Sequence, residues 1–268
     1  MSELEYQIIK SIGFVLALLF VLGLQVLRPH SDPGVGQNGH ARSSWRQNAS
    51  AWALNSVILG VVCTGCACAV SRWAEIRGIG LLNHVEVNAW LALPVTFLGM
   101  DFVSYVWHRA NHRISLLWRF HQVHHSDSNF TATTAVRFHF GELLLALPLR
   151  LAAVIVLGVP ILGVIAFEVF FAFANFFEHG DIDLPSWLET PMATVFITPA
   201  LHRRHHSRDA ELLNSNYATI FSFWDRAFRS YGSSSSEAQI QIGLPGLAEG
   251  LGAREMIMLP IRGIYRGD

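Results

Sequence analysis

Charged side chains are scarce in this sequence. Asp, Glu, Lys and Arg make up 15% of its 268 residues, whereas hydrophobic residues make up 51% and the mean hydropathy is +0.35. Soluble domains usually carry about 25% charged residues. The shortage argues against an ordinary water-soluble domain and favours a protein of the lipid bilayer. The formal net charge is only -1, and we expect no nucleic-acid partner.

Cysteine is also scarce. The three cysteines, Cys63, Cys66 and Cys68, fall within one apolar stretch. Cysteines in such a position are usually small packing residues, so we expect neither a disulfide nor a zinc or redox motif there. Their spacing does not suit an iron–sulfur cluster. The His-Glu-x-x-His pattern typical of zinc hydrolases is absent as well.

Long apolar runs, in contrast, are abundant. A helix needs about 20 apolar residues to cross the hydrocarbon core, and residues 8–27, about 51–70 and about 89–107 reach this length. A longer run over residues 143–177 contains Gly158 and Pro160, where a helix would break. We therefore predict an all-α, multi-span membrane helical bundle. In it, residues 143–177 form a helical hairpin that either spans the bilayer or dips into it and returns.

Arginine is distributed unevenly between the segments that connect these helices. Several arginines follow each of the first span, the third span and the hairpin, whereas residues 71–87 contain only Arg72 and Arg77. By the positive-inside rule, the arginine-rich segments are expected on the cytoplasmic face.

The first apolar run is longer than the core of a secretory signal and has no basic segment before it apart from Lys10, so we expect an anchor.

Three parts of the chain are expected. Residues 1–107 would hold three N-terminal spans, residues 108–230 a histidine-rich catalytic region with the hairpin, and residues 231–268 a cytoplasmic tail. The tail alternates apolar and polar residues near Ile240 and Ile242. This pattern fits either a cap against the membrane surface or a peripheral packing segment.

Histidine is concentrated in the second half of the chain. Ten of the 13 histidines lie between His108 and His206, mostly three or four residues apart. Residues at these spacings share one face of a helix. They form three short groups, which we call histidine combs: His108 and His112; His121, His124 and His125; His202, His205 and His206. Neutral imidazole binds iron, zinc, copper and nickel. One zinc ion uses about three or four ligands, so this many histidines indicate two transition-metal ions in one site.

Two residues of the third span share the spacing of the first comb. Asp101, Tyr105, His108 and His112 follow one another by four, three and four residues, so they are expected on one helix face. An ionisable group inside a span is costly enough to indicate function, and we take Asp101 and Tyr105 as candidate catalytic residues. We expect Asp101 to accept a hydrogen bond from a ligand imidazole, as carboxylates beside metal-bound histidine do. The alternative is a helix-end carboxylate paired with an arginine.

Glu142 and Glu178, which are close in sequence to His139 and His179, could orient imidazoles in the same way. A site with two ferrous ions can activate O2 with two external electrons and oxidise an unactivated C–H bond. At a membrane surface, such a site suits a lipid whose chain enters from the bilayer.

Three alternatives fit the composition less well. A zinc-dependent membrane hydrolase acting on a lipid would use an imidazole-rich site to activate water. A haem cytochrome would place facing histidines at membrane depth without adjacent pairs, and a metal carrier would need ligands along a path across the bilayer. Metal content together with oxygen consumption would separate the hydrolase from an oxygenase.

The histidines sit within longer motifs that occur in a fixed order. These are residues 101–112 (DFVSYVWHRANH), 117–126 (LWRFHQVHHS), 137–139 (RFH), 175–180 (NFFEHG), 199–207 (PALHRRHHS), 216–217 (NY) and 224–228 (WDRAF). Together they resemble the fatty acid hydroxylase and sterol desaturase superfamily, which consists of integral membrane dimetal oxygenases. The resemblance covers nearly half the chain.

The resemblance implies a site with two iron ions (Fe²⁺), O2 as co-substrate, and hydroxylation or desaturation of a fatty acyl, sterol, isoprenoid or ether lipid. Zinc could occupy the site as a substitute. Electrons would come from an external ferredoxin, cytochrome or reductase. The resemblance also implies metal-ligand roles for these histidines: His108, His112, His121, His124, His125, His139, His179, His202, His205 and His206.

Two positions depart from the superfamily pattern. Relatives often carry a second histidine after the one at His179, and none follows here. His139, Asn175 or water could fill the remaining ligand position, so Asn175 joins the candidate catalytic residues. After Phe228 the chain has Arg229 where the pattern usually has glycine, which affects the local turn more than the chemistry.

Overall fold

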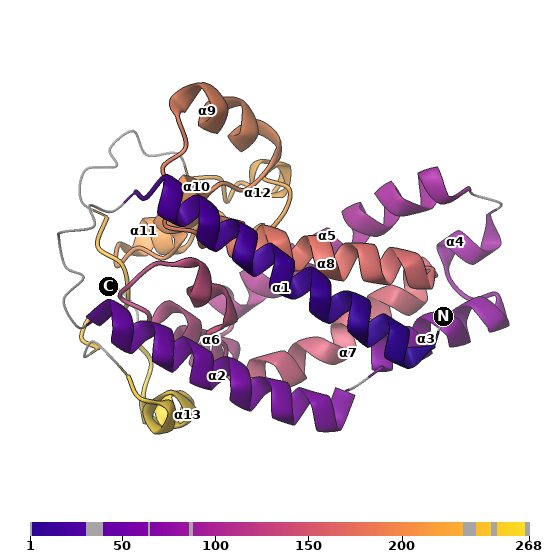
Figure 1. Cartoon of the computed structure of the whole chain (residues 1–268), viewed down its shortest axis with the longest axis horizontal. Helices are drawn as coiled ribbons and strands as arrows, with labels where there is room; N and C mark the ends of the chain where they lie inside the picture. Colours follow the sequence, from indigo (N-terminus) through magenta and orange to yellow (C-terminus); the bar gives the residue numbers. More distant parts are fainter. Residues whose placement is uncertain are drawn as a thin grey trace.

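The chain folds almost wholly into helices. The structure is a computed structural model, and it describes residues 2–30, 40–63, 65–85, 88–232, 240–247 and 251–265. Within these ranges, extended segments pair only through isolated bridges. The helices are, in chain order (Figure 1), α1 (Glu3–Leu27), α2 (His40–Cys63), α3 (Cys66–Arg77), α4 (Leu81–His84), α5 (Ala89–Arg113), α6 (Ser115–His125), the 3-10 helix η1 (Ala132–Val136), α7 (Phe140–Leu157), α8 (Ile161–Glu178), α9 (Ser186–Val195), α10 (Pro199–His205), α11 (Ala210–Leu213), α12 (Phe223–Ala227) and α13 (Ala253–Arg262).

Five helical stretches are long and apolar enough to cross a membrane. They are Glu3–Leu27, Ser44–His84, Trp90–Arg113, Phe140–Leu157 and Ile161–Glu178. At most 39% of the apolar window of each stretch is buried inside the protein, so large side chains such as Leu19, Phe20 and Val61 lie on the outer surface. Exposed apolar surface of this extent is unfavourable in water and expected in lipid. The predicted all-α, multi-span membrane bundle is therefore confirmed.

The sequence suggested that the second apolar run forms one helix, but the structure divides it into two. It is divided between α2 and α3 at Gly65, which has a left-handed backbone with φ of 73°. Glycine adopts this conformation without a steric penalty, and a Cβ at this position would also collide with Glu3. Cys63 and Cys66 thus flank a break between helices instead of lying inside a continuous span, and all three cysteines are free thiols.

The hairpin over α7 and α8 turns at Gly158, which also has a left-handed backbone, with φ of 65°. Glycine at this position ends a helix readily, and Pro160 caps the start of the next one. A Cβ on Gly80 would lie 2.3 Å from the backbone nitrogen of Gly158. The segment before α4 therefore touches the hairpin turn backbone to backbone.

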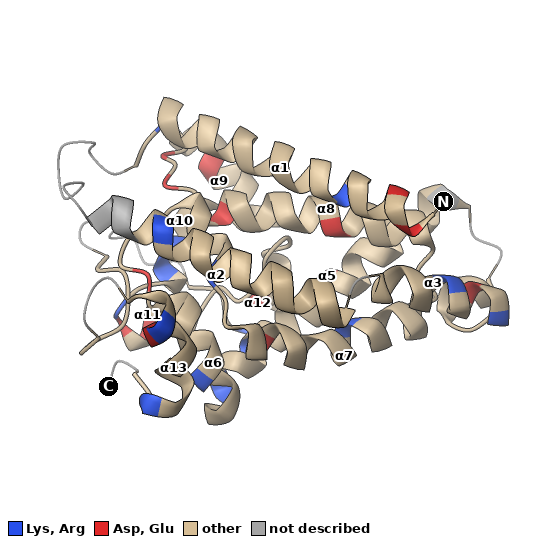
Figure 2. Ribbon diagram, turned by 60° about the horizontal axis from the view of Figure 1, so that its bottom comes forward, with Lys and Arg blue, Asp and Glu red and all other residues tan. Residues whose placement is uncertain are grey.

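Because α7 and α8 form a hairpin, the start of α7 and the end of α8 lie at one end of the molecule. Helix α1 packs along α8 (Figure 1), where Gly13 leaves room for Val169 and Phe14 meets Phe176 edge to face at 4.9 Å. The short helices α6 and α9–α13 gather at the end where α8 finishes and α7 begins. Figure 2 shows Lys and Arg concentrated around α6, α10, α11 and α13, whereas the long helices are mostly uncharged. We call this end the polar cap.

The described part of the C-terminal tail packs on the outer side of α6. The indole nitrogen of Trp118 donates to Tyr265 O at 3.1 Å, and Gln122 Nε2 donates to Gly263 O at 2.8 Å. Arg119 Nη1 donates to Pro260 O at 3.0 Å. Helix α13 therefore supports the helix that carries the second comb. The remaining residues expected in the tail, 233–239, 248–250 and 266–268, lie outside the described residues.

Candidate metal centre

Nine histidines meet in the polar cap as two groups of potential metal ligands. Group A contains His108, His112, His121, His125 and His205, and group B contains His124, His179, His202 and His206. Within each group the potential ligand atoms lie within 4.8 Å of one another. All nine side chains are buried except that of His108, which is half-buried. Three of the four elements that supply them were visible as combs, and His179 joins them from the end of α8.

Each three-histidine comb is divided between the two groups. On α6, His121 and His125 belong to group A while His124 belongs to group B. Residues four apart differ by about 40° around a helix, whereas adjacent residues differ by about 100°. His124 and His125 therefore cannot point at the same ion as easily as His121 and His125 can. The sequence analysis expected all histidines of a comb to share one helix face, but the structure divides this comb between two metal positions.

The comb at the end of α10 is divided in the opposite sense. His202 and His206 belong to group B, and His205 belongs to group A. The same rule applies, because the pair four residues apart stays together. Helix α6 thus sends two rings to group A and one to group B, while the α10 comb sends one to group A and two to group B.

The two groups adjoin one another. The rings of His125 in group A and His206 in group B stack with centroids 4.3 Å apart and planes 18° apart. His121 and His124 also lie with ring centroids 5.3 Å apart, one in each group. The arrangement is therefore one centre with two positions, not two separate sites.

Backbone carbonyl groups fix the orientation of three rings. The Nδ1 atoms of His108, His205 and His179 lie 2.7 Å from the carbonyl oxygens of Tyr217, Ser215 and Asn175, respectively. A carbonyl oxygen can only accept, so each Nδ1 carries the proton and each Nε2 keeps its lone pair. This tautomer is the one in which Nε2 can bind a metal.

Burial keeps five of the grouped rings neutral. It lowers the pKa of His179 and of His205 to about 3. It also holds the pKa of His124, His125 and His206 well below the usual 6.5, and the neighbouring imidazoles lower these pKa values further. A charged imidazolium is disfavoured in a buried site among other imidazoles. At neutral pH these rings are therefore in the form that binds metal.

The facing nitrogen atoms fit a bound cation in each group. His205 Nε2 lies 2.9 Å from His108 Nε2, and His179 Nε2 lies 3.0 Å from His124 Nε2 and 3.0 Å from His202 Nε2. The Nδ1 atoms of His108 and His205 hold their protons, so two lone pairs face each other without a hydrogen between them. Two nitrogens bound at right angles to one ion at about 2.1 Å lie about 3.0 Å apart. The donor set therefore fits a transition-metal ion.

Two carboxylates lie beside the imidazoles, as the sequence suggested for Glu142 and Glu178. Glu142 Oε1 is 2.8 Å from His121 Nδ1 and also accepts from Asn111 Nδ2 at 2.9 Å. The oxygens of Glu178 lie 3.8 Å from His179 Nδ1 and 3.6 Å from His202 Nδ1. Glu142 thus holds a ring of group A by a hydrogen bond, whereas Glu178 lies near two rings of group B beyond hydrogen-bond distance.

His139 lies apart from both groups, contrary to the expectation that it would be a ligand. It is the N-cap of α7, and its Nδ1 accepts from Gly141 N at 2.9 Å. Its Nε2 lies 3.2 Å from Ile257 O on α13. The side chain therefore caps the helix by accepting from a backbone nitrogen of its first turn.

Asn175, the other candidate for the remaining ligand position, has its side chain engaged elsewhere. Its backbone oxygen accepts from His179, and its side chain donates to Ala135 O at 3.1 Å.

Asp101 and Tyr105 lie on the α5 helix that also carries His108, but they contact a different part of the site. Asp101 accepts from the backbone nitrogens of Ile220 and Phe221 at 3.2 and 3.1 Å and from Trp224 Nε1 at 3.0 Å. The structure therefore corrects the expectation that Asp101 accepts from a ligand imidazole. Tyr105 Oη lies 2.9 Å from Ser230 Oγ and accepts from Arg109. Both residues hold the 217–230 segment in place.

The turn at Asn216 is the feature that sequence reasoning missed. Asn216 has a left-handed backbone with φ of 52°, a conformation that asparagine tolerates better than most residues. Its side chain donates to Leu201 O and Gly232 O and accepts from Gly232 N. The turn presents the carbonyls on either side of Asn216 to His205 and His108. A carbonyl is common to every residue, so only the Asn-Tyr motif could have pointed here.

A cavity of about 220 Å³ opens beside the histidines. We call it the inner cavity. Its wall combines ligand candidates such as His108, His121 and His179 with apolar side chains such as Phe138 and Phe171. The ring of His124 stacks on Phe138 with centroids 4.5 Å apart and planes 4° apart. An aliphatic group could therefore lie against the imidazoles in a largely apolar enclosure.

Replacing Glu142 should weaken metal binding without removing a ligand. In Glu142→Gln the side chain keeps its size but loses the charge that faces His121 Nδ1, so we expect metal affinity to fall by about 10–100-fold. Competition with a chelator of known affinity measures the change. Glu75→Gln, an exposed position on α3, is the matched control and should bind the metal as the wild type does. Equal affinity in all three proteins would contradict the orienting role.

Comparisons with known proteins identify relatives. A family profile described as Fatty acid hydroxylase matches residues 93–230, just over half of the chain. The ornithine lipid hydroxylase OlsE of Rhizobium tropici is 30% identical over 167 residues, covering 61% of this chain and 50% of that protein. Alkylglycerol monooxygenase of Xenopus tropicalis is 30% identical over 167 residues, covering 59% and 34%. A very-long-chain aldehyde decarbonylase of Oryza sativa subsp. indica is 31% identical over 146 residues, covering 51% and 22%.

The chain spans half or less of the length of these curated relatives. No solved structure matches it significantly. The matched region contains all nine grouped histidines, both carboxylates beside them and the turn at Asn216. Most of the motifs that resembled the superfamily thus contribute to the centre, and the chain belongs to the fatty acid hydroxylase family.

Proposed function

We propose that this protein is a membrane-embedded oxygenase that uses O2 and two electrons to hydroxylate or desaturate an aliphatic C–H position of a lipid. The observation that carries the proposal is the pair of adjoining histidine groups, in which eight of the nine side chains are buried, beside a largely apolar cavity. The relatives are named for action on an ornithine lipid, an alkylglycerol and a very-long-chain aldehyde. These names support a substrate with a long aliphatic chain.

Two iron ions are the proposed cofactors, one for each group. Group A offers five imidazoles and group B four. When bound, a pair of ferrous ions supplies the activation of O2 that oxidation of an unactivated C–H bond requires. A zinc hydrolase needs about three ligands and one open position on a single ion, so two complete sets of imidazoles do not favour that alternative.

The side chains around the centre have separable tasks. Glu142 and the carbonyls of Ser215 and Tyr217 hold ligand rings in one orientation. Phe138 and Phe171 exclude water from the inner cavity and leave an apolar surface for the substrate chain. Excluding water protects the oxidising site from side reactions.

The polar cap is proposed to face the cytoplasm. Its arginines lie at the end of the bundle that carries the histidines (Figure 2), and cytoplasmic segments of membrane proteins are enriched in Lys and Arg. An external ferredoxin, cytochrome or reductase would deliver electrons to this face. The lipid would reach the inner cavity from the bilayer side.

The test is turnover by the full chain reconstituted with iron in detergent. With a chemical reductant, isotope-labelled O2 and a mixture of membrane lipids, mass spectrometry should detect a product that has gained one labelled oxygen or lost two hydrogens. Zinc-loaded protein is the control and should give neither product. Hydrolysis products without O2 consumption would instead assign the site to a zinc hydrolase.

A further inference from the structure

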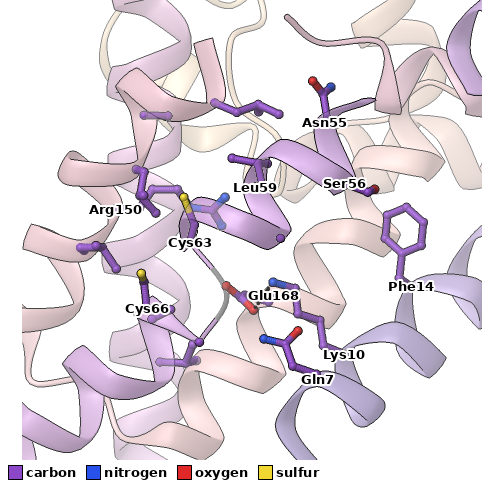
Figure 3. Close-up of a pocket in the computed structure, with 18 of the residues that line it drawn as sticks. Gln7, Lys10, Phe14, Asn55, Ser56, Leu59, Cys63, Cys66, Arg150 and Glu168 are labelled. Carbon is purple, nitrogen blue, oxygen red and sulfur yellow. Dashed lines mark ion pairs between the residues drawn. The ribbon is translucent and has the colours of Figure 1, made fainter. Parts of the chain in front are cut away.

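A second and larger cavity, of about 660 Å³, adjoins the inner one. We call it the outer cavity. It lies within the membrane-spanning helices, and Figure 3 shows Lys10 of α1, Arg150 of α7 and Glu168 of α8 around it. Phe138, Leu143, Ala146 and Arg150 line both cavities. A molecule in the outer cavity could therefore extend past these shared residues to the histidines.

The outer cavity contains more positive than negative charge. Its ionisable lining consists of Lys10, Arg150 and Glu168, apart from Tyr6 and the free cysteines Cys63 and Cys66. Lys10 Nζ lies 3.1 Å from Glu168 Oε2, which also accepts from Tyr6 Oη at 2.6 Å. Glu168 thus already has two partners, and among the described residues that line the outer cavity no carboxylate forms an ion pair with Arg150.

Arg150 is the unusual member of this set. Its guanidinium lies 5.5 Å from the centre of the Phe171 ring. Among the described residues, no carboxylate lies within ion-pair distance of it. The carboxylates of the inner cavity, Glu142 and Glu178, face imidazoles instead. A guanidinium inside a membrane span is costly unless it pairs with another group.

We propose that Arg150 binds an acidic group of the lipid substrate, a carboxylate or a phosphate, at the junction of the two cavities. The flat guanidinium donates two parallel hydrogen bonds to either group, and the attraction is stronger away from water. The proposal rests on the proposed function in so far as the bound molecule is the substrate. The hydrocarbon chain then has the inner cavity beside the histidines available to it.

The position of Arg150 also bears on which carbon reaches the metals. Arg150 follows Glu142 by eight residues on α7, which is about 12 Å along the helix. The Arg150 guanidinium lies 5.5 Å from the centre of the Phe171 ring, and both side chains line the inner cavity. An acidic group held there would fix the distance between the polar end of the lipid and the centre.

Binding of three probes with the same alkyl chain tests the proposal without turnover. Hexadecanoate, hexadecyl phosphate and hexadecan-1-ol compete with radiolabelled hexadecanoate for the iron-loaded full chain in a neutral detergent. We expect at least one acid to bind about tenfold or more tightly than the alcohol, because charged hydrogen bonds are strong. The stronger acid indicates whether a free fatty acid or a phospholipid is the source of the acidic group.

The variants assign the preference to one side chain. Arg150→Gln should lower affinity for the acids to that for the alcohol and leave the alcohol unaffected. Arg77→Gln, which removes an exposed arginine at the end of α3, should keep the wild-type preference. If Arg150→Gln does not fold, Arg150→Lys keeps a charge without the planar fork and should retain only part of the preference.

Two outcomes would overturn the proposal: equal affinity of the wild type for all three probes, or an unchanged preference for acids in Arg150→Gln. Neither depends on catalysis. If the acid preference is present and depends on Arg150 but no oxidised lipid is formed in the turnover assay, the oxygenase proposal fails while the acid-binding site stands.

Discussion

His205→Ala is expected to reduce bound iron from about two ions per chain to at most one and to lower turnover by about a thousandfold or more, well beyond the 10–100-fold cost of losing an outer partner. His205 Nε2 faces His108 Nε2 at 2.9 Å in group A, and its Nδ1 proton is held by Ser215 O. The alanine removes one of the five potential ligands of group A. His124→Ala should have the same effect through group B, where His124 Nε2 faces His179 Nε2.

The matched control for both variants is His139→Ala. His139 lies in the same region of sequence but outside both groups, where it caps α7. It should lose some stability and keep both irons. Iron is counted by elemental analysis of purified protein, and membrane extraction checks that insertion is intact. Two irons in His205→Ala and His124→Ala, or iron lost from His139→Ala alone, would refute the ligand assignment.

Removing the metal should destabilise the polar cap strongly. An ion present at about 1,000 times its dissociation constant stabilises the folded state by about 4 kcal/mol. For a chain of this size, each kcal/mol shifts the unfolding midpoint by about 2–4 °C. We therefore expect a chelator to lower the midpoint by about 8–16 °C. The physical reason is that facing lone pairs such as those of His108 and His205 repel each other when no cation lies between them.

Tryptophan fluorescence during heating measures this change, because Trp118 packs against the rings of His112 and His125. The double variant His124→Ala/His205→Ala provides the control. Its midpoint should already be low and should not respond to the chelator. An unchanged midpoint in the wild type would show that the nine histidines hold no ion that matters for the fold.

The membrane-spanning part of the fold was largely predictable because local signals determine it. Apolar length identifies α1, α5 and the hairpin, and Gly158 with Pro160 marks the turn between α7 and α8. The break at Gly65 was missed because an isolated glycine in an apolar run is compatible with a continuous helix. Gly65 lies against Glu3 of α1, and this tertiary contact is not visible in the local sequence.

The histidines of the centre were predictable, but their division was not. Helical spacing identifies His121 and His125 as partners. It does not say that His124 turns to a second group, since that depends on where α8 delivers His179. The contacts of Asp101 depend on the 217–230 segment, which is far away in sequence. His139 was expected among the ligands because a histidine that caps a helix has the same sequence signature as a ligand, and the structure places it outside both groups.

Helices α6 and α10 each carry histidines of both groups, so the two metal positions should not be occupied independently. Both helices carry rings of group A and of group B on one backbone. An ion bound at group A would restrict both helices, and the second ion would then lose less conformational entropy and bind more tightly. A titration with ferrous iron should therefore pass from empty to doubly occupied chains, and molecules with a single ion should be rare throughout.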